Sequence, residues 1–82
     1  MKTADDRAVE WVDDEAVVLN PETGDLHYLN AQAAIVYALI LEHGYEGGLA
    51  EARRMFGAEK GFEGQLAELL ADMVERGLLV DG

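Results

Sequence analysis

Runs of alternating apolar and polar residues near the start of the chain predict β-strands. Residues 7–12 (RAVEWV) alternate in side-chain character, and residues 15–20 (EAVVLN) form a second run typical of a strand. The pair Asp13-Asp14 between them supplies the polar side chains that favour a turn. The pattern therefore predicts two neighbouring strands joined by a short connection.

The clearest local signal is the segment 21–25 (PETGD). Pro21 fits an early turn position, and Gly24 supplies the positive φ that such a turn needs later. Two antiparallel strands should flank it, which makes residues 26–29 (LHYL) a third strand. Asn30 ends this strand and is a preferred N-cap for the helix that follows.

The chain after Asn30 has the composition and periodicity of helices. Residues 31–43 include the continuous apolar run 33–41, which predicts a central, mostly buried helix. The three glycines between positions 44 and 48 predict a loop, after which residues 49–56 form a second helix. A third helix over residues 62–76 carries one apolar stripe made of Phe62, Leu66, Leu69, Leu70 and Met73.

The predicted order β-β-β-α-α-α favours an α+β fold, a small winged helix-turn-helix with a three-stranded antiparallel sheet followed by three helices. A chain of 82 residues buries only about 60–65% of its unfolded surface, so its core is thin. We therefore expect one domain over residues 1–82, with residues 1–6 flexible.

Charge and hydropathy narrow the range of partners and locations. Seventeen acidic residues against six basic ones give a net charge of −11, which repels phosphate backbones and anionic membrane surfaces. The run 33–41 is far shorter than the ~20 apolar residues that span a bilayer, and residues 1–10 resemble no signal peptide. We expect a cytoplasmic protein that binds neither nucleic acid nor membranes.

The composition also argues against an enzyme. The sequence has neither cysteine nor serine, which excludes those nucleophiles and any Cys-based zinc site. His27 and His43 lie on different predicted elements, so we expect no metal site and no cofactor. The acidic pairs, such as Asp13-Asp14, are adjacent in sequence and not opposed across a cleft, as general acid–base chemistry would need.

A winged helix suggests DNA binding, but the predicted third helix is acidic. It carries one arginine, Arg76, against four acids, which are Glu63, Glu68, Asp72 and Glu75. A protein- or peptide-binding module fits these charges better. Two alternatives stay open, which are a winged-helix regulatory or DNA-binding domain and a structural subunit of a larger enzyme.

The ordered combination of EWVDDEAVVLNPETGDLHYLNAQAA with the later LLADMVERGLL resembles the PqqD-like family, also called RiPP recognition elements. The resemblance runs from about Val9 to Leu79, and is greatest to stand-alone members found beside HPr-kinase-like genes. It implies three antiparallel strands packed on three helices. It also implies a non-catalytic peptide chaperone that captures the leader of a ribosomally made precursor peptide and presents it to a modifying enzyme.

In this family the leader adds as an extra strand to the third strand and lies against the third helix. The run 26–29 is short, apolar and free of lysine, so it is poorly protected against such pairing. Tyr28 fits a place in either the core or the groove. The peptide-binding residues implied by the resemblance are Asp25, Leu26, His27, Tyr28 and Leu29 on the strand, and Gln65, Leu69, Asp72, Met73 and Arg76 on the helix. The free protein is expected to be a monomer or a homodimer.

Overall fold

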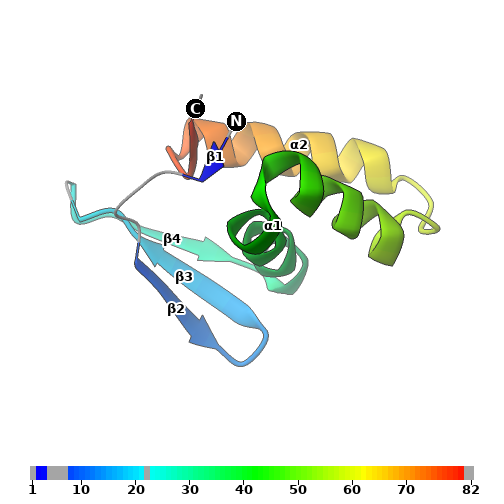
Figure 1. Cartoon of the computed structure of the whole chain (residues 1–82). Helices are drawn as coiled ribbons and strands as arrows, with labels where there is room; N and C mark the ends of the chain where they lie inside the picture. The colour runs from blue at the N-terminus through cyan, green and yellow to red at the C-terminus, as the bar shows by residue number, and fades with distance from the viewer. Residues whose placement is uncertain (1, 4–7, 22, 81–82) are drawn as a thin grey trace.

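Figure 1 shows the computed structural model of the chain, which describes residues 2–3, 8–21 and 23–80. The described elements follow in the order β1 (Lys2–Thr3), β2 (Ala8–Val12), β3 (Glu15–Leu19), β4 (Leu26–Leu29), α1 (Ala31–Phe56), α2 (Phe62–Glu75) and β5 (Leu79–Val80). The fold is α+β, with an antiparallel sheet that precedes the helices, as the sequence predicts.

The sheet has the strand order β2-β3-β4, and both pairs are antiparallel. The β2–β3 turn is Asp13-Asp14, and Asp13 takes a left-handed φ of 58°, which aspartate tolerates better than most residues. The turn before β4 places Gly24 at a φ of 76° and donates the Gly24 N–H to the Asn20 carbonyl at 2.7 Å. Both connections predicted from the sequence are confirmed.

The prediction of three helices is wrong, because the described helical segments are two. α1 runs through the segment predicted as a loop and is broken only at Gly44, whose φ of 81° and ψ of 173° are not helical. The chain then returns at once to helix, and Gly48 packs so closely on the first half that an added Cβ would lie 2.7 Å from the Ile40 Cα. Glycine at 48 therefore allows the two halves of α1 to meet.

The helix ends follow local rules. The Asn30 side chain accepts a hydrogen bond from the Ala33 N–H at 3.0 Å and so caps α1 as predicted. At the end of α2, Gly77 has a φ of 75°, and the Leu78 N–H donates to the Met73 carbonyl at 2.8 Å. This turn sends the chain back toward the sheet.

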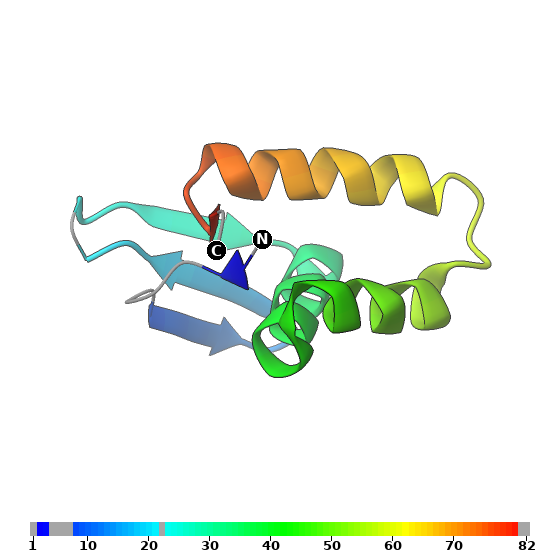
Figure 2. The ribbon, with the colours of Figure 1, turned by 45° about the horizontal axis from the view of Figure 1, so that its top comes forward.

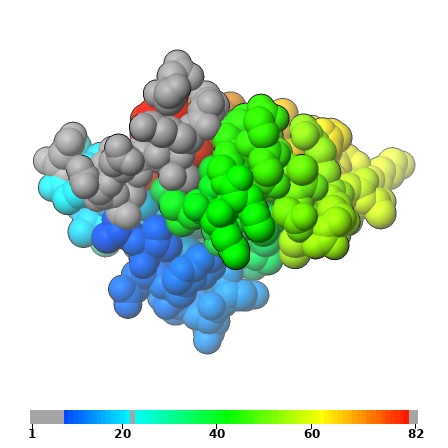
Figure 3. All heavy atoms as spheres, viewed as in Figure 1, coloured from blue at the N-terminus to red at the C-terminus, as the bar shows by residue number. Residues whose placement is uncertain are grey.

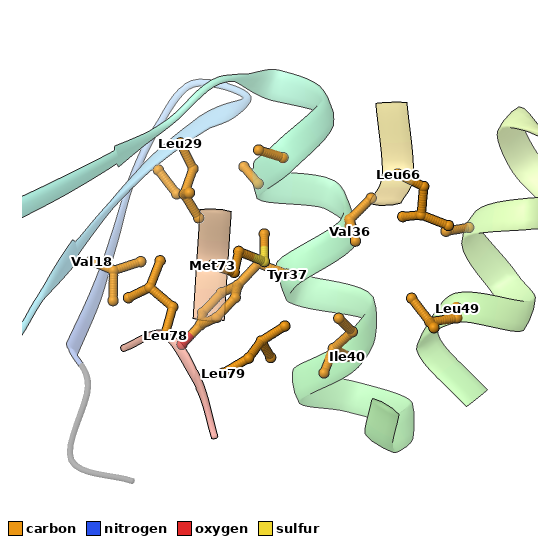
Figure 4. Packing of buried hydrophobic residues seen from close by; sticks show 14 of the residues in the cluster. Val18, Leu29, Val36, Tyr37, Ile40, Leu49, Leu66, Met73, Leu78 and Leu79 are labelled. Atoms are coloured by element: carbon orange, nitrogen blue, oxygen red, sulfur yellow. The ribbon is translucent and has the colours of Figure 1, made fainter. Parts of the chain in front are cut away.

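The core lies between the sheet, both helices and β5 (Figure 4). Val18 and Leu29 point into it from the sheet and meet Tyr37 of α1 and Met73 of α2. Leu78 and Leu79, which follow α2, close it from below.

β1 and β5 form a separate antiparallel pair, with Lys2 opposite Val80 and Thr3 opposite Leu79. Lys2 and Thr3 belong to the range 1–6 that was expected to be flexible, and the rest of that range lies outside the described residues.

Both helices lie on one side of the three-stranded sheet (Figures 1 and 2). Figure 2 also shows α2 running past the sheet on the side of β4. Within the residues that the structure describes, neither helix is both long enough and apolar enough to cross a membrane. The arrangement leaves three surfaces of the sheet for contact with other molecules, which are its β2 edge, its β4 edge and the face away from the helices. Of the two edges, only the β4 edge lies on the side of α2.

Candidate functional site: the free edge of the sheet

β4 is an edge strand, because among the described strands it pairs only with β3. The Asn20 N–H donates to the Asp25 carbonyl at 2.9 Å, which makes these two residues a hydrogen-bonded pair. Hydrogen-bonded and non-hydrogen-bonded pairs alternate along an antiparallel ladder. With Leu19 opposite Leu26 and Val17 opposite Tyr28, the backbone N–H and C=O groups of Leu26 and Tyr28 therefore point outward.

An independent contact supports this alternation. Arg76, at the end of α2, donates from Nη1 to the outward carbonyl of Tyr28 at 3.0 Å. The Arg76 Nε also pairs with the Asp72 carboxylate at 3.0 Å, one helical turn earlier. The end of α2 is thus tied directly to the open edge.

The β4 residues proposed from the sequence take different positions. Leu26 and Tyr28 are exposed, at 67% and 55%, whereas Leu29 is buried in the core and His27 is half-buried on the same side as Leu29. Asp25 precedes β4, and its carbonyl is held by Asn20, so its backbone belongs to the turn and not to the open edge.

The Tyr28 side chain points neither into the core nor toward α2. Its side chain shares with Val17 the sheet face that points away from the helices. The pKa of the Tyr28 phenol is raised, first by a hydrogen bond to the Glu15 carboxylate and further by partial desolvation and the charges of Glu15 and Asp14. The ring therefore reaches across the outer side of β3 toward Glu15.

The helical side of the site also needs one correction. Met73 has no exposed surface and packs in the core, so it supports the site from beneath and offers a peptide no contact. Gln65, Leu69, Asp72 and Arg76 recur at intervals of three and four residues and form one stripe along α2. Gln65 is exposed and the other three are half-buried, and the structure brings Asp72 and Arg76 to the β4 edge.

The described residues of the site offer backbone and side-chain groups that can bind a ligand. No three His, Asp or Glu side chains come together for a metal ion within residues 2–3, 8–21 and 23–80. The same part of the chain encloses no pocket, so a ligand would lie along the surface. Outward backbone groups beside a mixed apolar and polar helix stripe suit an extended chain better than a compact small molecule.

Comparison with known proteins identifies the family. Residues 15–79, which run from β3 to the first residue of β5, match the family described as coenzyme PQQ synthesis protein D (PqqD). The chain belongs to the PqqD family. The resemblance found in the sequence is thereby confirmed, and the match includes β4, α2 and every residue proposed for the site. A comparison with curated proteins gave no match.

The PqqD-family fold also occurs in a solved structure described as TbiB1 in complex with the TbiA(beta) leader peptide. The two chains are 23% identical and superpose with a TM-score of 0.79 over 99% of this chain and 100% of TbiB1. The likeness establishes a shared fold along almost the whole length of both proteins.

The raised pKa of Tyr28 gives a direct test of the site geometry in this PqqD-family protein. Glu15→Gln should lower the pKa of Tyr28 toward its ordinary value of about 10, because it replaces the carboxylate that accepts the hydrogen bond of the phenol and removes its negative charge. Ring chemical shifts followed across alkaline pH would measure it. Glu46→Gln, on α1, is the matched control and should leave the Tyr28 titration where it is. An unchanged Tyr28 pKa in Glu15→Gln would contradict the placement of the ring.

Proposed function

We propose that this protein is a single peptide-binding domain that captures the leader of a ribosomally made precursor peptide in the cytoplasm. It would then present the rest of the peptide to a modifying enzyme without catalysing the modification itself. The observation that carries the proposal is the open β4 edge, where the backbone groups of Leu26 and Tyr28 point outward and Arg76 of α2 reaches the Tyr28 carbonyl. Membership of the PqqD family and the shared fold with TbiB1, whose structure holds a leader peptide, support it.

Binding would proceed by strand addition. A leader strand beside β4 would exchange hydrogen bonds with the N–H and C=O groups of Leu26 and Tyr28. Its side chains would alternate in direction, one set facing Leu69 and Asp72 of α2 and the other set facing away from the helices. Backbone pairing would supply affinity common to many peptides, and the α2 stripe would select the sequence.

A titration tests this proposal. The ¹⁵N-labelled protein is mixed with the leader of a precursor encoded beside its gene, and with a scrambled peptide of the same composition as control. We expect saturable shifts centred on residues 26–29 and 65–76 for the leader alone. Since the protein carries a net charge of −11, the leader should be basic and its affinity should fall as salt rises. Equal binding of both peptides, or shifts centred on other elements, would overturn the proposal.

Arg76 occupies a position that the leader needs. Its guanidinium lies 3.0 Å from the Tyr28 carbonyl, which is the distance at which the N–H of an added strand would lie. Leader binding should displace Arg76 from this acceptor, so Arg76→Gln should bind the leader severalfold more tightly, consistent with about 1 kcal/mol for one lost competing hydrogen bond.

Arg54→Gln is the matched control for Arg76→Gln. Arg54 pairs with Glu51 on α1 and is exposed, so this variant removes the same charge from a different helix. Calorimetric titration of both variants with the leader would separate competition from charge. An affinity of Arg76→Gln equal to that of Arg54→Gln would show that Arg76 does not compete with the leader.

A further inference from the structure

The sheet face that points away from the helices is largely apolar. The register places the side chains of this outer sheet face in cross-strand rows, which are Ala8–Leu19–Leu26, Glu10–Val17–Tyr28 and Val12–Glu15. The opposite side holds the buried Ala16, Val18 and Leu29. The outer sheet face therefore joins six apolar side chains and two carboxylates on one surface.

The outer sheet face is open to solvent. Val12 is 53% exposed, and Leu26 and Tyr28 are exposed to a similar or greater degree. In Figures 1 and 3 the β2–β3 hairpin projects away from both helices. Both helices lie on the opposite side of the sheet (Figures 1 and 2). Monomeric proteins seldom leave contiguous apolar side chains on a sheet uncovered, so this face is suited to a protein partner.

Charge indicates the chemistry of that partner. Residues 8–29 contain no lysine or arginine and six acids, which are Glu10, Asp13, Asp14, Glu15, Glu22 and Asp25. A second copy of the chain on the same face would bring two such acidic segments together, which opposes a symmetric dimer. The complementary surface has an apolar centre bordered by lysine and arginine.

The outer sheet face adjoins the β4 edge, and this position indicates which protein would bind it. Leu26 and Tyr28 offer their backbone groups to the β4 edge and their side chains to the outer sheet face. Alternate side chains of a strand added to β4 would point to the same side as Tyr28. A protein on the outer sheet face would therefore touch the domain and the bound leader at once, as the modifying enzyme must.

We propose that the outer sheet face is the docking surface for the modifying enzyme, through an apolar patch on that enzyme bordered by basic residues. This inference rests on the proposed function, and it assigns the leader and the enzyme to adjoining but separate surfaces of one sheet. Substitutions on β2, the strand farthest from β4, should therefore weaken enzyme docking and spare the leader.

The test uses the full chain, the leader and the modifying enzyme encoded beside its gene. Val12→Glu and Glu10→Lys change exposed β2 side chains, and Met55→Glu changes a similarly exposed apolar residue (48%) on α1 as the matched control. Affinity for the immobilised enzyme and for the leader is measured separately for each variant. We expect both β2 variants to bind the enzyme at least about tenfold more weakly, with leader affinity within twofold of wild type, and Met55→Glu to match wild type in both.

The outcomes separate the two proposals. Wild-type enzyme affinity in both β2 variants would overturn the docking surface and leave leader binding intact. A wild-type protein that does not bind the leader would instead overturn the proposed function. A concentration-dependent dimer in sedimentation that Glu10→Lys changes would assign the face to a second copy of the chain, against this inference.

A measurement on the protein alone checks the charge argument. Amide relaxation is compared in the presence of a cationic and an anionic nitroxide of similar size. We expect the cationic probe to enhance relaxation several times more than the anionic one at residues 8–19. Equal enhancement by both probes would contradict a basic partner for this face.

Discussion

Proline at position 28 is expected to remove leader binding while the domain stays folded. The Tyr28 N–H points away from β3, so proline removes no bond of the existing ladder, and edge strands tolerate proline in that orientation. The same change deletes an N–H that an added strand would use and places the ring where that strand must approach. We expect a loss of about 3 kcal/mol, or roughly a hundredfold in affinity.

Two companion variants make this prediction specific. Tyr28→Ala keeps the N–H and loses a ring on the outer sheet face, so it should weaken leader binding by only about 1 kcal/mol. His27→Pro removes an N–H that bonds to β3 and should unfold the sheet. Circular dichroism and leader titration of the three variants would check this. A Tyr28→Pro variant that binds like wild type would contradict strand addition at β4.

Gly48→Ala is expected to lower the free energy of unfolding by about 2–3 kcal/mol, because an added methyl group would overpack the interior. Its Cβ would lie 2.7 Å from the Ile40 Cα and N and 2.8 Å from the Leu39 carbonyl carbon, all of them backbone atoms. The halves of α1 would have to separate, which loosens the packing of Ile40 and Leu49. For a chain of 82 residues this is a large share of a total stability of about 4–12 kcal/mol.

Gly64→Ala is the matched control. Gly64 lies inside α2 and a Cβ there would meet no atom within 4 Å, so alanine should raise stability by about 0.5–1 kcal/mol. Urea unfolding of both variants would measure the difference. Equal stability of Gly48→Ala and wild type would show that α1 does not need the close approach at this glycine.

The features predicted correctly from the sequence are local. The turn at 21–25, the Asn30 cap and the apolar stripe of α2 that begins at Phe62 each depend on residues within a few positions of one another. The structure contains all three. The strand 26–29 was identified by the turn before it and the cap after it. Its place at the edge was implied by the family resemblance and is confirmed by the strand order.

The features that the sequence did not predict depend on contacts between distant residues. The three glycines at 44–48 favour a loop when only their neighbours in the sequence are considered. In the structure Gly48 is helical and packs on Ile40, and only Gly44 has non-helical backbone angles. Met73 and Leu69 lie on one stripe in the sequence, and only the packing shows that Met73 is fully buried. The Arg76 bond to Tyr28 spans 48 positions, and no local signal indicates it.

Amide hydrogen exchange at Leu26 and Tyr28, with and without saturating leader, tests the central claim most directly. Both amides point outward from the sheet in the free protein, and strand addition would give them acceptors. We predict that leader binding slows their exchange at least about tenfold, with a smaller change at His27 and Leu29, which already bond to β3. Unchanged exchange at Leu26 and Tyr28 with the leader bound would contradict the account.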